Sequence, residues 1–159
     1  MKNTKLIIAF IIIAIISAGG FYYLKPQSNI KLGAIFSPDD KKLVAFGKKL
    51  YANNCASCHG MNLEGERDWK NRNEQGLLPA PPHDETGHTW HHNDETLFSL
   101  TKYGLAKTAN LKDYKTNMPI YENILSDEKI ISIMSYVKST WPDEIIERHD
   151  QLNANQAQQ

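Results

Sequence analysis

The only two cysteines of the chain, Cys55 and Cys58, are separated by two residues and are followed directly by His59. Such a pattern is used by a zinc site, by a redox dithiol, by a structural disulfide and by covalent haem attachment. A zinc site needs four ligands, and without further cysteines it would have to recruit histidines from elsewhere in the chain.

A redox dithiol, a disulfide and a haem site differ in what must surround the cysteine pair. A thioredoxin-like dithiol begins a helix in a βαβ setting, whereas this pair follows a predicted helix and precedes a predicted loop. A disulfide between residues three apart closes a very short loop and so gains little entropy. Haem attachment needs two thiols at this spacing and a histidine directly after them. The pattern therefore favours one covalent haem c on Cys55 and Cys58, with His59 as the proximal iron ligand.

The iron has a second axial position, which needs a ligand from elsewhere in the chain. Thioether sulfur is a soft ligand, and a Met/His pair raises the reduction potential. Met61 is too close to the attachment site to reach across the ring, and Met134 falls on the packed face of a predicted helix. Met118, which precedes a proline in a predicted loop, could fill a gap in the core. We expect it instead to be the second axial ligand.

The N-terminus has the pattern of a membrane segment. Residues 6–24 carry no charge and would span about 28 Å as a helix, which is close to the thickness of a bilayer core. Lys2 and Lys5 precede this segment and place residues 1–5 in the cytoplasm. We expect an inner-membrane anchor with the rest of the chain in a bacterial periplasm. The alternative is a signal peptide that is cleaved near residues 17–19.

The charge balance excludes one class of partner. The chain has 18 Lys and Arg against 18 Asp and Glu, so its formal net charge is zero. A nucleic-acid-binding surface needs a clear basic excess. We therefore expect no nucleic-acid partner.

The first predicted helix must deliver the cysteines. Ser37 is a good N-cap, Pro38 suits the first helical position, and the helix is expected to end at residues 53–54, just before Cys55. Its apolar residues recur at steps of three and four and are Leu43, Phe46, Leu50 and Tyr51.

Two further helices are expected after a long irregular segment over residues 60–92. The first is short, Asp94 to Tyr103, between Asn93 as N-cap and Gly104 as C-terminal stop. Residues 105–125 are expected to form a loop. The second helix, Asp127 to Thr140, follows Ser126 as N-cap, and its apolar face consists of Ile130, Ile133, Met134 and Val137.

These elements define the expected organisation of the exported part. Residues 25–36 are a linker, residues 37–150 form one domain, and residues 151–159 form a polar, disordered tail. The helices offer too few apolar residues to bury the long loops. A porphyrin would supply the missing apolar surface of the core.

These motifs occur in the order seen in class I c-type cytochromes, and the chain resembles a membrane-anchored, single-haem, bacterial member of that family over about residues 37–142. The parts are a helix, CASCHG, a proline-rich loop, a middle helix, NMPIY and LSDEKIISIMSYVKSTWP. Gly47 and Tyr51 resemble one half of the family's helix crossing, and Ile133 and Tyr136 the other. The resemblance implies an all-α, cytochrome c-like fold of three or more helices and long loops around one haem.

The resemblance also implies roles for further residues. In the family a proline carbonyl accepts a hydrogen bond from the proximal histidine, and Pro81, or else Pro79, matches that proline. A tryptophan before the middle helix donates to a haem propionate in some members, and Trp90 is similar to it. The implied function is one-electron transfer between redox proteins, such as respiratory complexes, and not catalysis. The alternative is a haem with an open position that binds a gas or peroxide.

The segment HDETGHTWHH departs from the family pattern by its four histidines. Imidazole suits copper, so His88, His91 and His92 are candidates for a second metal site, with His83 nearby, and the protein could handle copper. The simpler interpretation gives these histidines propionate or surface roles.

The loop before Met118 is rich in lysine. Such residues either form a docking patch that steers an acidic redox partner or are ordinary solvated side chains. The lysines concerned are Lys102, Lys107, Lys112 and Lys115.

Overall fold

The computed structural model describes residues 35–158. The predicted cytoplasmic N-terminus, the anchor at residues 6–24 and most of the linker lie outside the described residues. All regular elements within residues 35–158 are helices, so the predicted all-α class is confirmed for this part of the chain. None of the helices there is both long and apolar enough to cross a membrane.

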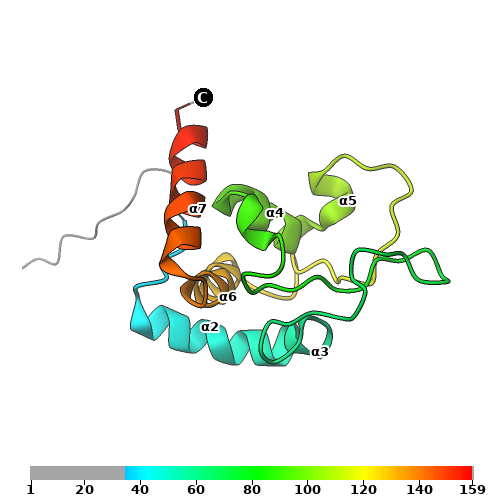
Figure 1. Ribbon diagram of the computed structural model, residues 1–159, viewed down its shortest axis with the longest axis horizontal. Coiled ribbons are helices and arrows are strands. Elements are labelled where there is room, and N and C mark those ends of the chain that lie inside the picture. Colours follow the sequence, from blue (N-terminus) through cyan, green and yellow to red (C-terminus); the bar gives the residue numbers. More distant parts are fainter. Residues whose placement is uncertain (1–34, 159) are drawn as a thin grey trace, which may run out of the picture. The chain divides into compact units, whose positions relative to one another are not determined.

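The described part contains six α-helices and one short 3₁₀ helix, η1 (Figure 1). They are α2 (Lys41–Asn54), α3 (Ala56–His59), η1 (Thr89–His91), α4 (Asp94–Tyr103), α5 (Leu105–Thr108), α6 (Asp127–Ser139) and α7 (Asp143–Gln156).

Helix α2 begins later than the sequence predicts. Its N-cap is Asp40, whose carboxylate accepts hydrogen bonds from the amides of Lys42 and Leu43 at 3.0 and 3.1 Å. The expected cap, Ser37, precedes a turn and donates its own amide N–H to the hydroxyl of Ser135 at 3.0 Å. A carboxylate that reaches two orphan amides is the better cap, because it satisfies both donors at once.

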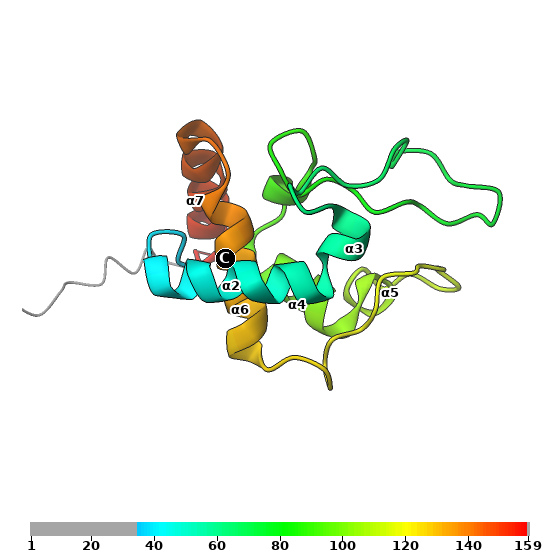
Figure 2. The same cartoon turned by 90° about the horizontal axis from the view of Figure 1, so that it is seen from below.

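The crossing of α2 over α6 holds the domain together (Figures 1 and 2). Gly47 lies at the contact, where a Cβ atom would overlap the backbone carbonyl of Ser132 and approach Ile133. One turn later, the ring of Tyr51 packs edge-on against that of Tyr136, with 5.5 Å between centroids. Only a glycine therefore lets the two backbones approach this closely.

The face of α2 that packs on α6 differs from the predicted stripe. Gly47 and Tyr51 are its buried residues, while Leu43 and Leu50 are half-buried. Phe46 is 46 % exposed, so its assignment to the apolar face is wrong. The close crossing is centred on Gly47, and this turns the neighbouring Phe46 toward the surface.

Helices α4 and α6 follow the sequence closely. The Asn93 side chain caps α4 by accepting from the Thr96 amide at 2.8 Å, and Gly104 ends the helix with a positive φ. Ser126 is the N-cap residue of α6, although its side chain makes no capping bond. The short helix α5 lies in the segment predicted to be loop. The predicted face of α6 is buried at Ile130, Ile133, Met134 and Val137.

Helix α7 corrects the expectation of a disordered tail over residues 151–159. The chain stays helical through Gln156, and Asn153 is 2 % exposed. The Asn153 amide oxygen accepts from the Asp94 backbone N–H at 2.8 Å, and its NH₂ group donates to the Asp94 carboxylate at 2.9 Å. Because α7 is anchored by hydrogen bonds as well as by a few apolar contacts, its sequence shows no clear apolar stripe.

A buried ionic network connects α4, α6 and α7. The Asp94 carboxylate accepts from the backbone amides of Ile35 and Phe36 at 2.6 and 2.8 Å. It also lies 3.9 Å from the Lys138 ammonium, which is 2.7 Å from Asp150. Asp94 and Lys138 are almost fully buried. Removal of one member of such a network leaves an uncompensated buried charge, which costs about 3–5 kcal/mol.

His149 belongs to the same network. Its Nε2 is 2.8 Å from the His92 carbonyl and 3.6 Å from the Asp94 carboxylate. Burial lowers the pKa of His149, and Lys138 lowers it further, while Asp94 opposes the change. The neutral imidazole therefore donates its Nε2–H to the His92 carbonyl.

We predict that Gly47→Ala destabilises the protein by about 1–3 kcal/mol, because the added methyl group overlaps a backbone carbonyl across the crossing. Urea unfolding measures the effect. Lys48→Ala, at the exposed neighbouring position of α2, is the matched control and should change stability by less than about 0.5 kcal/mol. Since alanine is the better helix former, an increase in stability would contradict the close crossing.

We also predict that His149→Gln makes stability less dependent on pH. The folded pKa of His149 lies below its unfolded value near 6.5, so the unfolded chain binds more protons as the pH falls. Native stability should therefore fall between about pH 7 and pH 5, by at most about 1.4 kcal/mol per pH unit for this residue. Glutamine keeps an N–H donor but does not titrate. Equal slopes in urea unfolding for native and variant protein would contradict the assignment.

Candidate metal centre

The two cysteines and the histidine are carried by one helical turn that continues from the end of α2 (Figure 1). Cys55 caps α2, and its carbonyl accepts from the amides of Cys58 and His59 at 3.2 and 2.9 Å. Residues three and four apart on a helix share a face. Cys58 and His59 therefore both follow Cys55 by one helical turn, within reach of it along the chain.

Both thiols are free; Cys55 is half-buried and Cys58 is exposed. Burial raises the pKa of the Cys55 thiol to about 11, and the neighbouring Cys58 contributes to the increase. Catalytic dithiols have depressed pKa values, because the thiolate is the reactive form. The Cys55 thiol is thus protonated at neutral pH, which does not fit a redox dithiol.

His59 is oriented by a backbone carbonyl. Its Nδ1 lies 2.8 Å from the Pro81 oxygen, so Pro81 and not Pro79 is the partner. Burial lowers the pKa of His59, although the bond to Pro81 opposes this change. A neutral imidazole that donates from Nδ1 keeps the lone pair of Nε2, which is the arrangement that a metal-binding histidine needs.

The Pro81 carbonyl is held in place by the loop that follows α3. The Gly65 amide donates to the His59 carbonyl at 2.8 Å, and the Glu66 amide donates to the Ala80 carbonyl at 2.8 Å. Gly65 has φ +66°, and a Cβ atom there would press on the backbone of Pro81. A glycine is therefore required for the two segments to lie side by side.

The segment that carries Met118 is tied to the same end of α2. The Tyr121 hydroxyl donates to the Asn54 carbonyl at 2.6 Å, and the Tyr121 amide donates to Thr101 in α4 at 3.4 Å. Burial raises the pKa of Tyr121 to about 12, so its hydroxyl remains a donor. Met118 itself is half-buried. The segment that carries Met118 is thus bound to the carbonyl of Asn54, the residue that precedes Cys55.

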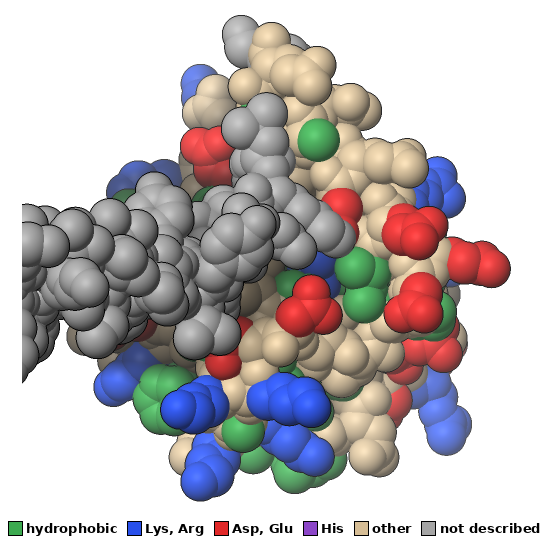
Figure 3. Space-filling model, turned by 90° about the vertical axis from the view of Figure 1, so that its left-hand side faces the viewer, with side chains coloured by type: hydrophobic (Ala, Val, Ile, Leu, Met, Phe, Trp, Pro, Cys, Tyr) green, Lys and Arg blue, Asp and Glu red, His purple; other side chains and the backbone are tan. Residues whose placement is uncertain are grey.

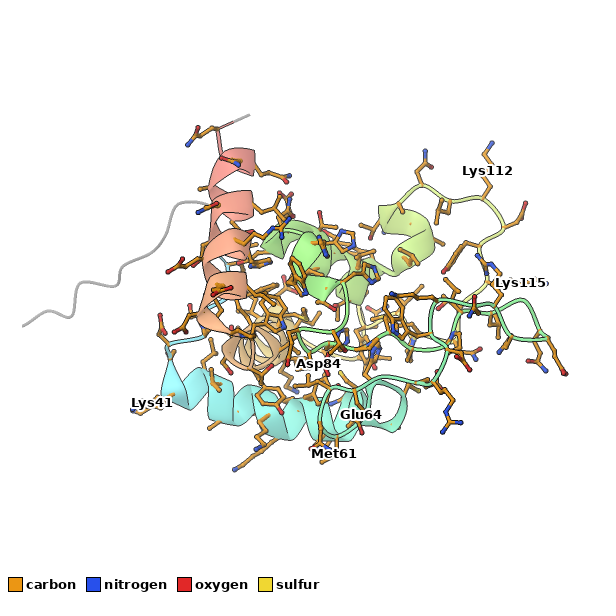
Figure 4. All side chains as sticks on the ribbon, in the orientation of Figure 1. Lys41, Met61, Glu64, Asp84, Lys112 and Lys115 are labelled. Carbon is orange, nitrogen blue, oxygen red and sulfur yellow. The ribbon has the colours of Figure 1, made fainter. Side chains whose placement is uncertain are left out.

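The other described methionines are placed as the sequence suggests. Met61 is 62 % exposed and lies at the surface near α3 (Figure 4). Met134 is buried in the packed face of α6. Among the methionines of residues 35–158, Met118 is therefore neither largely exposed nor packed in the face of a helix.

Two of the three histidines proposed as a second metal site stack on tryptophan rings. The His88 ring stacks on Trp69 with 5.4 Å between centroids, and the His91 ring stacks on Trp90 at 3.7 Å. No group of three or more His, Cys, Asp or Glu side chains in the described part of the chain is arranged to hold a metal ion. The rings of His88 and His92 meet edge-on with 5.5 Å between centroids, but they are not part of a group of three such ligands.

The Trp90 side chain has protein partners in this structure. Its indole N–H, which the resemblance assigns to a haem propionate, donates to the Glu85 carbonyl at 3.3 Å. Its ring contacts the His91 ring and lies 5.2 Å, measured from the ring centroid, from the Arg148 guanidinium. The contacts of Trp90 are thus made within its own turn and with α7.

The predicted lysine patch divides into two pairs. Lys102 forms an ion pair with Asp127 at 2.6 Å, and Lys107 lies over a tyrosine ring. Lys112 and Lys115 project from the loop before Met118 (Figure 4). With Arg72 they line an open concave region of about 420 Å³ between two loops. Arg72, which is distant in sequence, thus lies near Lys112 and Lys115.

The face drawn in Figure 3 carries both acidic and basic side chains, so its charge does not indicate a docking surface. Figure 3 shows basic side chains along the lower part of that face and acidic side chains beside them. The lysines of α2 are exposed and are Lys41, Lys42, Lys48 and Lys49.

Sequence reasoning missed several contacts that support the site. The Trp141 indole donates to the His83 carbonyl at 2.8 Å, and the Tyr51 hydroxyl donates to the Gly60 carbonyl at 3.0 Å. The His83 ring stacks on His59 with 4.0 Å between centroids. The sequence does place His83 near the site, because it follows Pro81 by two residues and the Pro81 carbonyl binds His59. The contacts of Trp141 have no local sequence signal.

Comparison with known proteins identifies a family. The family model for cytochrome c matches residues 44–141. The Cbb3-type cytochrome c oxidase subunit CcoP of Rubrivivax gelatinosus is 36 % identical over 50 residues, which are 31 % of this chain and 16 % of that protein. The chain thus matches only a small part of that relative's length. No solved structure matches the chain.

We predict that a His88→Ala, His91→Ala, His92→Ala triple variant binds Cu²⁺ as the native protein does, because these side chains are not arranged as a metal site. Isothermal titration of both proteins with Cu²⁺ measures this. A stoichiometric site that is present in the native protein and lost in the triple variant would contradict the expectation.

Proposed function

The chain belongs to the cytochrome c family, and we propose that it carries single electrons on one covalent haem c, bound through Cys55 and Cys58 with His59 and Met118 as axial ligands. One observation supports this most strongly. Two free thiols and a neutral imidazole share one helical turn, and the Pro81 carbonyl binds the histidine nitrogen that a metal would not use.

The donor set of the site fits this cofactor. Two thiols on one turn match covalent attachment, and imidazole with thioether matches a low-spin iron. When bound, haem c supplies an iron that alternates between the ferrous and ferric states.

Each residue of the proposed site then has a defined role. Cys55 and Cys58 attach the cofactor, and the hydrogen bond to the Pro81 carbonyl orients the His59 ring and raises its basicity. Tyr121 holds the Met118 segment against the end of α2. With both axial positions filled by the chain, no position remains for a substrate, so these residues support electron transfer and not catalysis.

We propose a membrane setting for this carrier. Residues 6–24 would anchor it in the inner membrane, with the haem domain in the periplasm. The partial relative is named as a subunit of an oxidase, and we propose respiratory complexes as donor and acceptor. A tether would raise the effective concentration of the carrier near partners in the same membrane. The concave region beside Arg72, Lys112 and Lys115 would suit an acidic partner.

We predict that the native protein, expressed with haem-attachment machinery, keeps its haem on the chain after denaturation. Its oxidised form should show the weak far-red absorption band that marks Met–iron ligation in this family. Met118→Ala should lose this band and lower the reduction potential, because a Met/His pair raises it.

Met61→Ala is the matched control, because Met61 is exposed; it should keep the band and the potential. A native protein with covalent haem but without the band would reject Met118 as ligand. It would support the alternative of an open haem that binds a gas or peroxide.

A further inference from the structure

The histidine-rich segment 83–92 folds into a compact turn against the proline-rich loop. The Asp84 carboxylate accepts from the amide and the hydroxyl of Thr86 at 2.9 and 2.6 Å. At Gly87 a Cβ atom would overlap the Pro82 carbonyl. The turn is therefore closed by its own polar groups and lies directly beside the residue that follows Pro81.

The first residue of this turn faces the proposed iron ligand. The His83 ring stacks on the His59 ring with 4.0 Å between centroids and an interplanar angle of 19°. The ring of Tyr51 meets His83 edge-on at 6.3 Å. His83 thus lies between the buried helix crossing and His59.

Three hydrogen bonds fix the position of His83. Its amide donates to the Leu63 carbonyl at 2.8 Å, and its carbonyl accepts from the Trp141 indole at 2.8 Å. Its Nδ1 lies 2.8 Å from the Thr89 hydroxyl oxygen. Backbone and side chain are both held, so the ring has little freedom to rotate.

The side chain of Thr89 connects the His83 ring to the proline-rich loop. Its hydroxyl oxygen lies 2.8 Å from the His83 Nδ1 and 3.4 Å from the Pro82 carbonyl oxygen. The His83 ring is therefore held from the same turn that packs on the residue after Pro81.

The two contacts of His59 restrict different motions. The Pro81 carbonyl fixes the direction of the Nδ1–H bond, but a single hydrogen bond allows the ring to rotate about that direction. A second ring stacked nearly parallel on one face blocks this rotation. Orientation of an axial histidine and the polarity around it both tune a haem iron.

We propose that His83 is a positioning residue for the proximal ligand His59, and that the turn 83–92 holds it in place through Thr89. This role explains why the segment is rich in polar residues without forming a metal site. The inference rests on the proposed function, because it takes His59 as the iron ligand.

The test uses the haem-loaded full chain and two readouts, the reduction potential and the paramagnetic NMR shifts of the haem methyl groups and the His59 ring. His83→Leu removes the stack and the polar ring, so it should change the pattern of methyl shifts and raise the potential, because an apolar shell disfavours the more highly charged ferric state. His83→Phe restores a stacked ring and should return the methyl shifts toward the native pattern.

Thr89→Val is the conservative variant, because it removes the hydroxyl that lies 2.8 Å from the His83 Nδ1 and keeps the shape of the side chain. It should shift the His59 signals by less than His83→Leu does. His91→Ala is the matched control, because this histidine of the same turn is exposed and stacks on Trp90. It should leave both readouts unchanged.

The outcomes separate this inference from the proposed function. A native protein without covalent haem would reject the proposed function itself. Haem-loaded His83→Leu with native potential and native shifts would reject only the role of His83. If His83→Leu does not take up haem, Thr89→Val decides, and native His59 signals in that variant would overturn the inference.

Discussion

The close approach of α2 and α6 is the contact on which the rest of the structure depends. Gly47 permits it, because any side chain there would overlap the backbone of Ser132. The crossing sets the direction of α2, and α2 in turn delivers Cys55 to the start of the next helical turn. Tyr51, one turn after Gly47, extends the same contact to His83 and the loop carbonyl of Gly60. Helix packing and the proposed site are thus parts of one arrangement.

The loops around the site are ordered mainly by hydrogen bonds, because they contain few apolar residues. Backbone carbonyls serve as the fixed points: Pro81 for His59, Asn54 for Tyr121 and His83 for Trp141. In each case a side-chain donor reaches a segment that is distant in sequence. Such bonds are individually modest, at about 0.5–1.5 kcal/mol. Together they define the positions of the proposed ligands.

Away from this site, a buried ionic network connects the beginning and the end of the domain. Asp94 binds the amides just before the first turn and also contacts Lys138 and α7. Buried charges are stable only when they are fully paired. This requirement explains why a helix with a polar sequence, α7, docks firmly, and why the domain extends to Gln156.

The sequence alone determined the chemistry and much of the helical framework, because both depend on local patterns. The spacing of Cys55, Cys58 and His59 indicated haem attachment, and caps at Asn93 and Gly104 defined α4. Tertiary structure decided which residues share an environment. It exposed Phe46, gave the Trp90 indole a protein partner, ordered α7 and placed His83 against His59. No local pattern encodes these outcomes, because each depends on contacts between segments that only the packed chain brings together.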